Sequence, residues 1–178
     1  SRGLGDVYKR QVEKEDGSLE RLEFHNEDKF NFAFDIVDGL ARREPDKLAM
    51  VHVANDMTER RFTFKDMKDA LSQAANYFTS LGVKRGDRVM LVLKRHYQFW
   101  FAILGLHKLG AIAIPATNQL MEHDFTYRFK AAGVSAIVCT ADGDTAHQVD
   151  IAEADAGVHL TKVLVGGKRE GWHDFDAE

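Results

Sequence analysis

The chain has 178 residues, of which 44% are hydrophobic and 29% charged, a composition typical of one soluble globular domain. Its net charge is −4 with both signs interspersed, and this lack of a basic stripe argues against a nucleic-acid partner. The longest apolar run, residues 99–106, is too short to span a membrane. A single cysteine, Cys139, excludes an internal disulfide framework and, with no signal-peptide core at the N-terminus, favours a cytoplasmic location.

The first thirty residues carry little pattern. Residues 1–11 (SRGLGDVYKRQ) lack an initiating Met and an amphipathic pattern, so we expect a non-native or disordered tail there. Residues 12–29 are interpreted as an N-terminal extension. The folded domain is expected over residues 30–178.

A helix and a β-hairpin open the folded domain. Apolar residues recur at helical spacing over residues 31–43, and Pro45 follows. Residues 48–53 alternate as a strand, residues 55–56 form a turn signal, and residues 60–63 supply the returning strand.

The next helix carries clear signals at both of its ends. Thr63 lies three residues before Asp66, which is close to a capping box. The apolar face of the helix runs to Leu81, and Gly82 is placed to end it in a left-handed cap.

Strands and helices alternate after Gly82. The pattern predicts strands at 89–93, 111–114, 136–139 and 163–165, and helices at 99–109, 122–132 and 145–156. Such alternation implies right-handed crossovers, and the unbroken apolar strands imply burial on two faces. We therefore predict an α/β fold: a mainly parallel sheet with helices on both faces, preceded by a helix and a β-hairpin.

The helix at 99–109 is apolar on nearly every side, so it is expected to be central and packed on two sides. Burial of Phe99, Trp100, Phe101, Ile103 and Leu104 would then contribute about 1.5–3 kcal/mol each.

Two strand ends are candidate binding segments, because ligands of open parallel sheets bind beyond the carboxyl ends of the strands. One presents Asn118 and Gln119, and the other presents Asp142 and Gly143. The same residues are common in ordinary turns and helix caps, so this alternative stays open.

Other chemistry finds no support in the motifs. The chain has no Walker loop, no G-x-G-x-x-G, no H-E-x-x-H and no G-x-S-x-G. Residues 166–168 (GGK) are interpreted as a turn. Cys139 is expected to be a buried, inert strand residue, because no base or positive charge lies near it in the sequence.

An ordered set of segments resembles one enzyme family. Residues 62–67 (FTFKDM) and 106–115 (LHKLGAIAIP) resemble the first two core motifs of the adenylate-forming superfamily, L-T-Y-x-E-L and L-K-A-G-A-x-Y-V-P. Residues 81–89 (LGVKRGDRV) are similar to a join common in acyl-CoA synthetases. Residues 30–37 resemble the opening segment of medium-chain and aryl carboxylate-CoA ligases. The chain thus resembles the N-terminal subdomain of an adenylate-forming (AMP-dependent) acyl-CoA synthetase.

The resemblance implies a two-step reaction in the parent enzyme: formation of an acyl-adenylate from a small carboxylic acid and ATP, then transfer of the acyl group to CoA. It implies ATP, Mg²⁺ and CoA as cofactors, and a medium-chain or aromatic acid as substrate. The family's phosphate-binding loop, acidic metal ligand, ribose-binding Asp and C-terminal Lys do not occur by Glu178. We therefore expect a fragment that is inactive alone, binds no cofactor tightly, and has as partners the missing subdomains of its parent.

By this analogy, the fragment supplies at most part of a CoA surface, which would involve Asn118, Gln119, Asp142 and Gly143. The resemblance implies no catalytic residue and no metal ligand within the chain. A basic group of Arg85, Arg88, Lys94 and Arg95 is interpreted as solvated charge, with contact to a CoA phosphate as the alternative.

Two other functions stay open at this point. The chain could be a free-standing flavodoxin-like module that binds a nucleotide or another ligand. It could instead be a structural subunit that completes an enzyme in trans.

Overall fold

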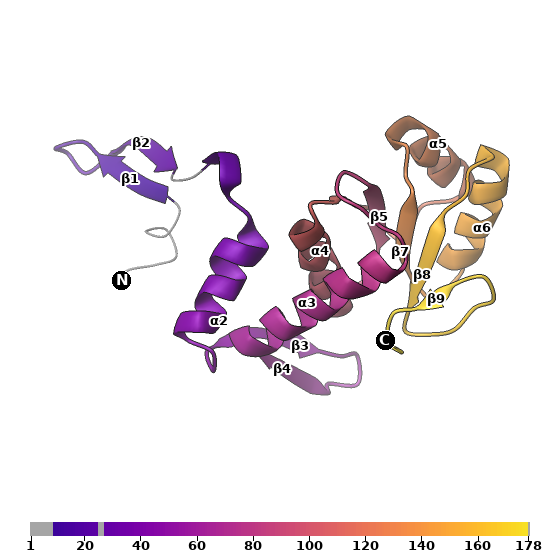
Figure 1. Cartoon of the computed structure of the whole chain (residues 1–178), viewed down its shortest axis with the longest axis horizontal. Coiled ribbons are helices and arrows are strands. Elements are labelled where there is room, and N and C mark those ends of the chain that lie inside the picture. The colour runs from indigo at the N-terminus through magenta and orange to yellow at the C-terminus, as the bar shows by residue number, and fades with distance from the viewer. Residues whose placement is uncertain (1–8, 25–26, 178) are drawn as a thin grey trace. The chain divides into compact units, whose positions relative to one another are not determined.

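A computed structural model describes residues 9–24 and 27–177 (Figure 1). The chain divides into two compact units, residues 1–68 and residues 69–178, and helix α3 (Phe64–Ser80) runs from the first into the second. Of the tail expected at 1–11, residues 1–8 lie outside the described residues. The last three residues of that segment belong to a strand.

This strand, β1 (Lys9–Glu13), pairs antiparallel with β2 (Leu19–Phe24) in a hairpin that the sequence pattern did not reveal. Its turn contains Gly17 at φ 80° and Asp16, whose carboxylate accepts a hydrogen bond from the Ser18 N–H at 2.9 Å. Charged residues outnumber apolar ones in β1 and equal them in β2, and no strict alternation marked either strand in the sequence. A short 3₁₀ turn, η1 (Glu27–Lys29), follows.

The helix predicted at 31–43 is present, but its first part is a π-helix, η2 (Ala33–Asp38), which continues as α2 (Gly39–Arg43). Asn31 organises its start: the Asn31 side-chain oxygen accepts a hydrogen bond from the Ala33 N–H at 3.0 Å, and the Asn31 N–H donates to the Asp35 carboxylate at 2.7 Å. These bonds satisfy backbone and side-chain groups at the helix end.

The predicted second hairpin is confirmed. Strand β3 (Leu48–Val53) pairs antiparallel with β4 (Glu59–Thr63). The capping box also forms, because the Asp66 N–H donates to the Thr63 hydroxyl at 3.2 Å and the Thr63 N–H donates to the Asp66 carboxylate at 2.9 Å.

The second unit contains a five-stranded sheet in which every pairing is parallel, in the order β6-β5-β7-β8-β9. Its strands are β5 (Arg88–Val92), β6 (Ile112–Pro115), β7 (Ala136–Thr140), β8 (Thr161–Val165) and β9 (His173–Asp174). Its helices after α3 are α4 (Gln98–Leu109), α5 (Glu122–Ala132) and α6 (Thr145–Ala156). The predicted α/β fold is therefore confirmed, and β9 is an addition to it.

Successive residues of a strand pack into two separate cores, one on each face of the sheet. Val89 and Leu91 of β5 face a core that includes residues of α3 and α4. Met90 and Val92 face the opposite core, which includes residues of α5 and α6. Helices α5 and α6 lie side by side along one face of the sheet (Figure 1). The strands are continuous apolar runs because both of their faces are buried.

Helix α4 departs from the prediction. Leu104 is buried, whereas Phe99, Phe101 and Ile103 are only partly buried and the Trp100 side chain is 50% exposed. Of the five side chains expected to be buried, only Leu104 is, so the full burial energy is not realised. Gly110 ends the helix at φ 74°, in the left-handed cap typical of glycine.

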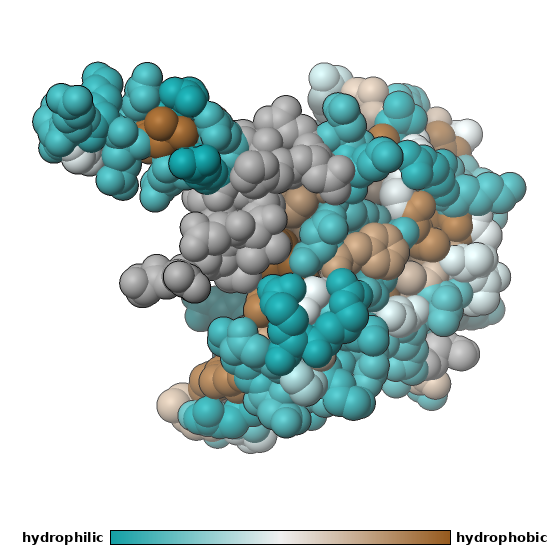
Figure 2. All heavy atoms as spheres, turned by 60° about the vertical axis from the view of Figure 1, so that its left-hand side comes forward, coloured by the Kyte–Doolittle hydropathy of each residue, from teal (hydrophilic) through white to brown (hydrophobic). Residues whose placement is uncertain are grey.

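The described surface is mixed in character. Figure 2 shows one face that is largely hydrophilic, with hydrophobic residues in small groups. Within residues 9–24 and 27–177, no helix has the length and apolar character needed to cross a membrane.

Candidate functional site

The strand order reverses direction at β5. The chain moves from β5 to β6 on one side and then to β7 on the other side. Such a reversal leaves a crevice beyond the carboxyl ends of the two strands that flank it, here β5 and β7, and ligands of open α/β sheets bind there.

Four side chains form what we call the open cluster at this point. Lys94 and His96 follow β5, while Thr140 ends β7 and Asp142 follows it. The Lys94 ammonium lies 3.8 Å from the Asp142 carboxylate, and the Thr140 hydroxyl lies 3.5 Å from His96 Nε2. Both distances are long for a hydrogen bond, and the Lys94 and Asp142 side chains are 42% and 60% exposed. The Lys94–Asp142 pair is thus accessible and loosely held, whereas Thr140 is buried and its hydroxyl also accepts the Asp142 N–H at 3.1 Å.

The structure brings the four candidate residues to this same edge. Asp142 and Gly143 lie in the loop between β7 and α6, and both are exposed. Asn118 and Gln119 lie in the loop between β6 and α5. The two loops are joined by the Thr145 hydroxyl, which donates to the Asn118 carbonyl oxygen at 3.3 Å. The prediction that these residues face one ligand surface is consistent with this placement, while their role stays a prediction.

The backbone at this edge is closely packed. Gly166 and Gly167 form a bend directly after β8, where the sequence predicted a turn. A Cβ on Gly167 would lie 2.8 Å from the Cβ of Ala141, so only glycine fits without displacement. The loop after β7 is thereby supported by the loop after β8.

The charges at this edge do not suit a triphosphate. Asp142 and Asp144 expose carboxylates in the β7–α6 loop, and these would repel phosphate oxygens. The glycines there, Gly166 and Gly167, are followed by Lys168, whose ammonium lies 4.0 Å from the Asp174 carboxylate. Among the described residues, no group of three His, Cys, Asp or Glu side chains could hold a metal ion. The carboxylates of this edge suit hydroxyl or amine donors of a ligand, while Lys94 beside Asp142 offers a single contact to an anionic group.

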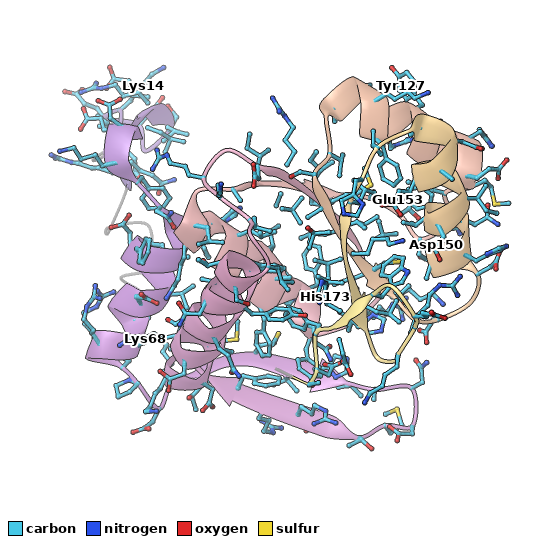
Figure 3. All side chains as sticks on the ribbon, turned by 45° about the vertical axis from the view of Figure 1, so that its right-hand side comes forward. Lys14, Lys68, Tyr127, Asp150, Glu153 and His173 are labelled. Carbon is cyan, nitrogen blue, oxygen red and sulfur yellow. The ribbon has the colours of Figure 1, made fainter. Side chains whose placement is uncertain are left out.

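A second group, which we call the closed cluster, lies between α6 and the segment after β8. The Asp150 carboxylate accepts hydrogen bonds from Lys162 Nζ at 2.8 Å, Arg169 Nε at 2.8 Å and Trp172 Nε1 at 3.0 Å. Lys162 also bonds Glu153 at 2.7 Å. Figure 3 shows Asp150 and Glu153 on successive turns of α6.

The protonation equilibria of the closed cluster follow from this pairing. Burial alone would raise the pKa of Asp150, but hydrogen bonds from Lys162, Arg169 and Trp172 outweigh it and hold that pKa below its usual value. Burial likewise disfavours the Lys162 ammonium, yet its bonds to Asp150 and Glu153 raise the pKa of Lys162. Each charge of the group is matched within the chain, so the loss of any one partner would be destabilising.

The predicted burial of Cys139 is confirmed. Its side chain is fully buried, and burial raises the pKa of the thiol to about 12. The thiol therefore stays protonated near neutral pH and is a poor nucleophile.

Sequence reasoning missed part of the open cluster. Lys94 was assigned to a group of solvated charges, with contact to a CoA phosphate as the alternative, and His96 was given no role in binding. The signal was available, because Lys94 and His96 directly follow a predicted strand, as the chosen candidates do. What the sequence did not provide was the strand order, which makes β5 the neighbour of β7.

The amino-acid sequence is similar to that of a known enzyme family and of several of its members. The model of the AMP-binding enzyme family matches residues 37–176. The chain is 34% identical over 157 residues to "Acyl-coenzyme A synthetase ACSM2, mitochondrial" of Rattus norvegicus, which covers 84% of this chain and 27% of that protein. It is 36% identical to "Acyl-coenzyme A synthetase ACSM5, mitochondrial" of Mus musculus, over 82% of this chain and 26% of that protein. The chain thus spans about a quarter of the length of these curated relatives.

Solved structures agree on the fold. A crystal structure of the anthranilate CoA ligase AuaEII in complex with anthranoyl-AMP superposes with a TM-score of 0.67 at 23% identity, over 83% of this chain and 27% of that chain. A fatty acyl CoA synthetase of Mycobacterium tuberculosis superposes with a TM-score of 0.65 at 25% identity, over 82% of this chain and 26% of that chain. These matches support the expected N-terminal subdomain and do not favour a free-standing flavodoxin-like module.

The expected cytoplasmic location was wrong. The names of the relatives above place those enzymes in mitochondria, which contradicts the expectation. The physical reason for the error is that one free cysteine excludes a disulfide framework but does not identify a compartment.

Proposed function

Because the chain belongs to the AMP-binding enzyme family, we propose that it is the first parallel-sheet region of an ATP-dependent carboxylate-CoA ligase. The parent enzyme joins a carboxylic acid to CoA through an acyl-adenylate, with release of pyrophosphate and then AMP. The observation that carries this proposal is the family match over residues 37–176, together with relatives of which the chain covers about a quarter.

Within that enzyme, this chain contributes scaffold and part of the CoA-binding surface. The residues proposed for CoA are Asn118, Gln119, Asp142 and Gly143, all at the carboxyl edge of the sheet. Their carboxylate and amide groups suit the amide and hydroxyl donors of CoA, and Lys94 beside Asp142 suits one of its phosphates. ATP and Mg²⁺ bind elsewhere in the parent, because this edge lacks a phosphate cradle.

The proposed substrate is a medium-chain or aromatic carboxylic acid, in fatty acid metabolism or a related pathway. Support comes from the opening segment at 30–37 and from the relatives, which act on acyl or aryl acids according to their names. The walls that select the acid belong to the remainder of the parent enzyme.

The chain alone is proposed to be inactive and prone to self-association. Trp100 and Ile112 are half-exposed apolar residues, and β6, which carries Ile112, is an edge strand of the sheet. Exposed apolar surface and an open strand edge both favour association between copies. A monodisperse monomer in light scattering at high concentration would contradict this expectation.

The CoA surface is tested in the parent enzyme. Asn118→Ala and Asp142→Ala should each raise the KM for CoA by about three- to tenfold, the effect of losing one hydrogen bond. They should leave the rate of pyrophosphate release in the first step unchanged. Asp155→Ala, an exposed carboxylate on α6, is the matched control. An unchanged KM for CoA in both variants would remove these residues from the proposed surface, and a parent without carboxylate-dependent pyrophosphate release would overturn the proposed function itself.

A further inference from the structure

Residues 173–176, which we call the strap, follow the loop after β8 and include strand β9. The strap is fixed to the sheet, because β9 pairs with β8 and the Phe175 N–H donates to the Leu164 carbonyl oxygen at 2.9 Å. It is also fixed to α3. The Tyr77 hydroxyl donates to the Asp174 carbonyl oxygen at 3.2 Å, and the rings of Tyr77 and Phe175 meet edge to face with centroids 5.9 Å apart.

Asp176, at the end of the strap, accepts hydrogen bonds from two further elements. One carboxylate oxygen accepts the Gly166 N–H at 2.8 Å, and the other accepts from the Gln98 side-chain amide at 2.8 Å. Gly166 begins the bend directly after β8, and Gln98 is the first residue of α4. The Asp176 carboxylate therefore joins the β8 bend to the start of α4.

The β8 bend in turn contacts both sides of the crevice at the carboxyl edge. The Ala141 N–H, directly before the candidate residues of the β7–α6 loop, donates to the Val165 carbonyl oxygen at 2.9 Å. A Cβ on Gly167 would lie 2.8 Å from the Cβ of Ala141, and a Cβ on Gly166 would lie 3.8 Å from His96 Nε2. A shift of this bend would therefore be felt by the loop after β7 and by the open cluster.

The bend needs an outside contact to keep one conformation. Gly166 and Gly167 have no side chains to anchor them, and consecutive glycines have more backbone freedom than any other pair of residues. A hydrogen bond to an ionised carboxylate is shorter and stronger than one between neutral groups. Asp176 supplies such a bond to Gly166.

We propose that Asp176 is a positioning residue for the carboxyl edge. By holding Gly166, it fixes the β8 bend against Ala141 and His96, and so keeps the loop that carries Asp142 in a conformation ready to bind CoA. Asp176 acts through the bend and makes no contact with the ligand. The kinetic consequence rests on the proposed ligase function, whereas the coupling of Asp176 to the bend is a property of this chain alone.

Two substitutions of Asp176 separate its hydrogen bonds from its charge. Asp176→Ala removes both bonds. Asp176→Asn removes the charge but keeps both contacts, because its side-chain oxygen accepts the Gly166 N–H and its NH₂ group donates to Gln98 Oε1 once the Gln98 amide turns over. Asp155→Ala, which removes an exposed carboxylate of α6, is the matched control.

Amide hydrogen exchange of the 178-residue chain, followed by NMR, measures the coupling. In Asp176→Ala, the amides of Gly166 and Ala141 should exchange about three- to tenfold faster, while that of Val138 in the middle of β7 keeps its rate. Asp176→Asn should change these rates by less than about twofold, and Asp155→Ala should leave them unchanged. Unchanged rates in Asp176→Ala, or equal acceleration in Asp176→Asn, would overturn the positioning role.

Kinetics of the parent enzyme test the consequence for CoA. Asp176→Ala should raise the KM for CoA by about two- to fivefold, because the surface is less preorganised, and should leave kcat and pyrophosphate release in the first step unchanged. Asp176→Asn should restore the KM. A loss of kcat in both steps with an unchanged KM would indicate general destabilisation and overturn the proposal. A parent without acid-dependent pyrophosphate release would instead overturn the ligase function, and the exchange rates would still decide the coupling.

Discussion

The closed cluster and the open cluster lie in the same unit, and both contain an acidic side chain opposite a basic one. In the closed cluster, Asp150 and Lys162 meet at 2.8 Å and are largely shielded from water. In the open cluster, Lys94 and Asp142 are 3.8 Å apart and both well exposed. The closed cluster is joined by short, shielded bonds, while the Lys94–Asp142 pair of the open cluster is long and exposed to solvent.

The difference shows how position in the fold decides the use of a charge. The closed cluster ties α6 to β8 and to the segment that follows it, and its bonds are made within the chain. The open cluster lies beyond the strands where the chain reverses its direction across the sheet. Charge type alone would not separate the two groups, but burial and bond length do.

The largest expected effect is on stability. Asp150→Ala removes the acceptor of three hydrogen bonds and leaves Lys162 with one partner, so unfolding free energy should fall by about 2–3 kcal/mol. Asp142→Ala should change it by less than about 0.5 kcal/mol, because exposed ion pairs contribute little. Urea denaturation measures the free energy of unfolding of both variants. Similar losses in the two would contradict the conclusion that only the closed cluster stabilises the fold.

Gly167, which is closely packed, is expected to tolerate substitution less well than Gly143, which lies in an exposed loop. Gly167→Ala places a Cβ 2.8 Å from that of Ala141 and should cost about 1–3 kcal/mol through overpacking. Gly143→Ala meets open space and should cost only about 1 kcal/mol, from its positive φ of 69°. Thermal melts of the two variants give the order, and a reversed order would mean that the loops are not in contact.

A smaller effect on the free energy of unfolding is expected from a change of pH, because pH alters one ionisation of the closed cluster at a time. The pKa of Asp150 is lowered in the folded state, so its contribution is complete above the ordinary value of 3.8 and is lost as pH falls through the folded pKa. The pKa of Lys162 is raised, so its contribution is complete below 10.5 and is lost as pH rises through the folded pKa.

The variant Asp150→Asn isolates the contribution of the Asp150 charge to stability at low pH. The stability gap between the unaltered chain and this variant should be constant from about pH 5 to 8 and should narrow below about pH 4. Denaturant titrations at a series of pH values measure the gap. A gap that widens in acid would show that the Asp150 carboxylate is not stabilised by its partners.

The smallest effect concerns Lys94. Lys94→Ala should raise the KM of the parent enzyme for CoA by about two- to threefold at low salt, and this difference should vanish at high salt through screening. Lys130→Ala, an exposed lysine on α5, is the matched control. An equal effect of both lysines would indicate a general charge effect rather than a contact at the open cluster.

Much of the fold could be predicted from the sequence because its signals are local. Thr63 and Asp66 cap α3 as expected, and Gly82, Gly110 and Gly133 adopt positive φ values at the ends of the predicted helices. Unbroken apolar runs identified the parallel strands, because burial on both faces removes alternation.

What could not be predicted depends on non-local contacts. The apolar residues of the β1–β2 hairpin do not alternate regularly, and β9 is only two residues long. The exposure of Trp100 depends on which neighbours cover α4. The candidate segments at Asn118 and Asp142 were found from strand ends, whereas Lys94 and His96 required the strand order.

The central claim is that this chain supplies the scaffold beside the nucleotide site and not the phosphate cradle. It is tested most directly by carboxylate-dependent pyrophosphate release from ATP and Mg²⁺, with a panel of medium-chain and aromatic acids and the parent enzyme as positive control. We predict release by the parent and none above background by the 178-residue chain. Sustained release by the chain alone, abolished by omission of the acid, would contradict the account.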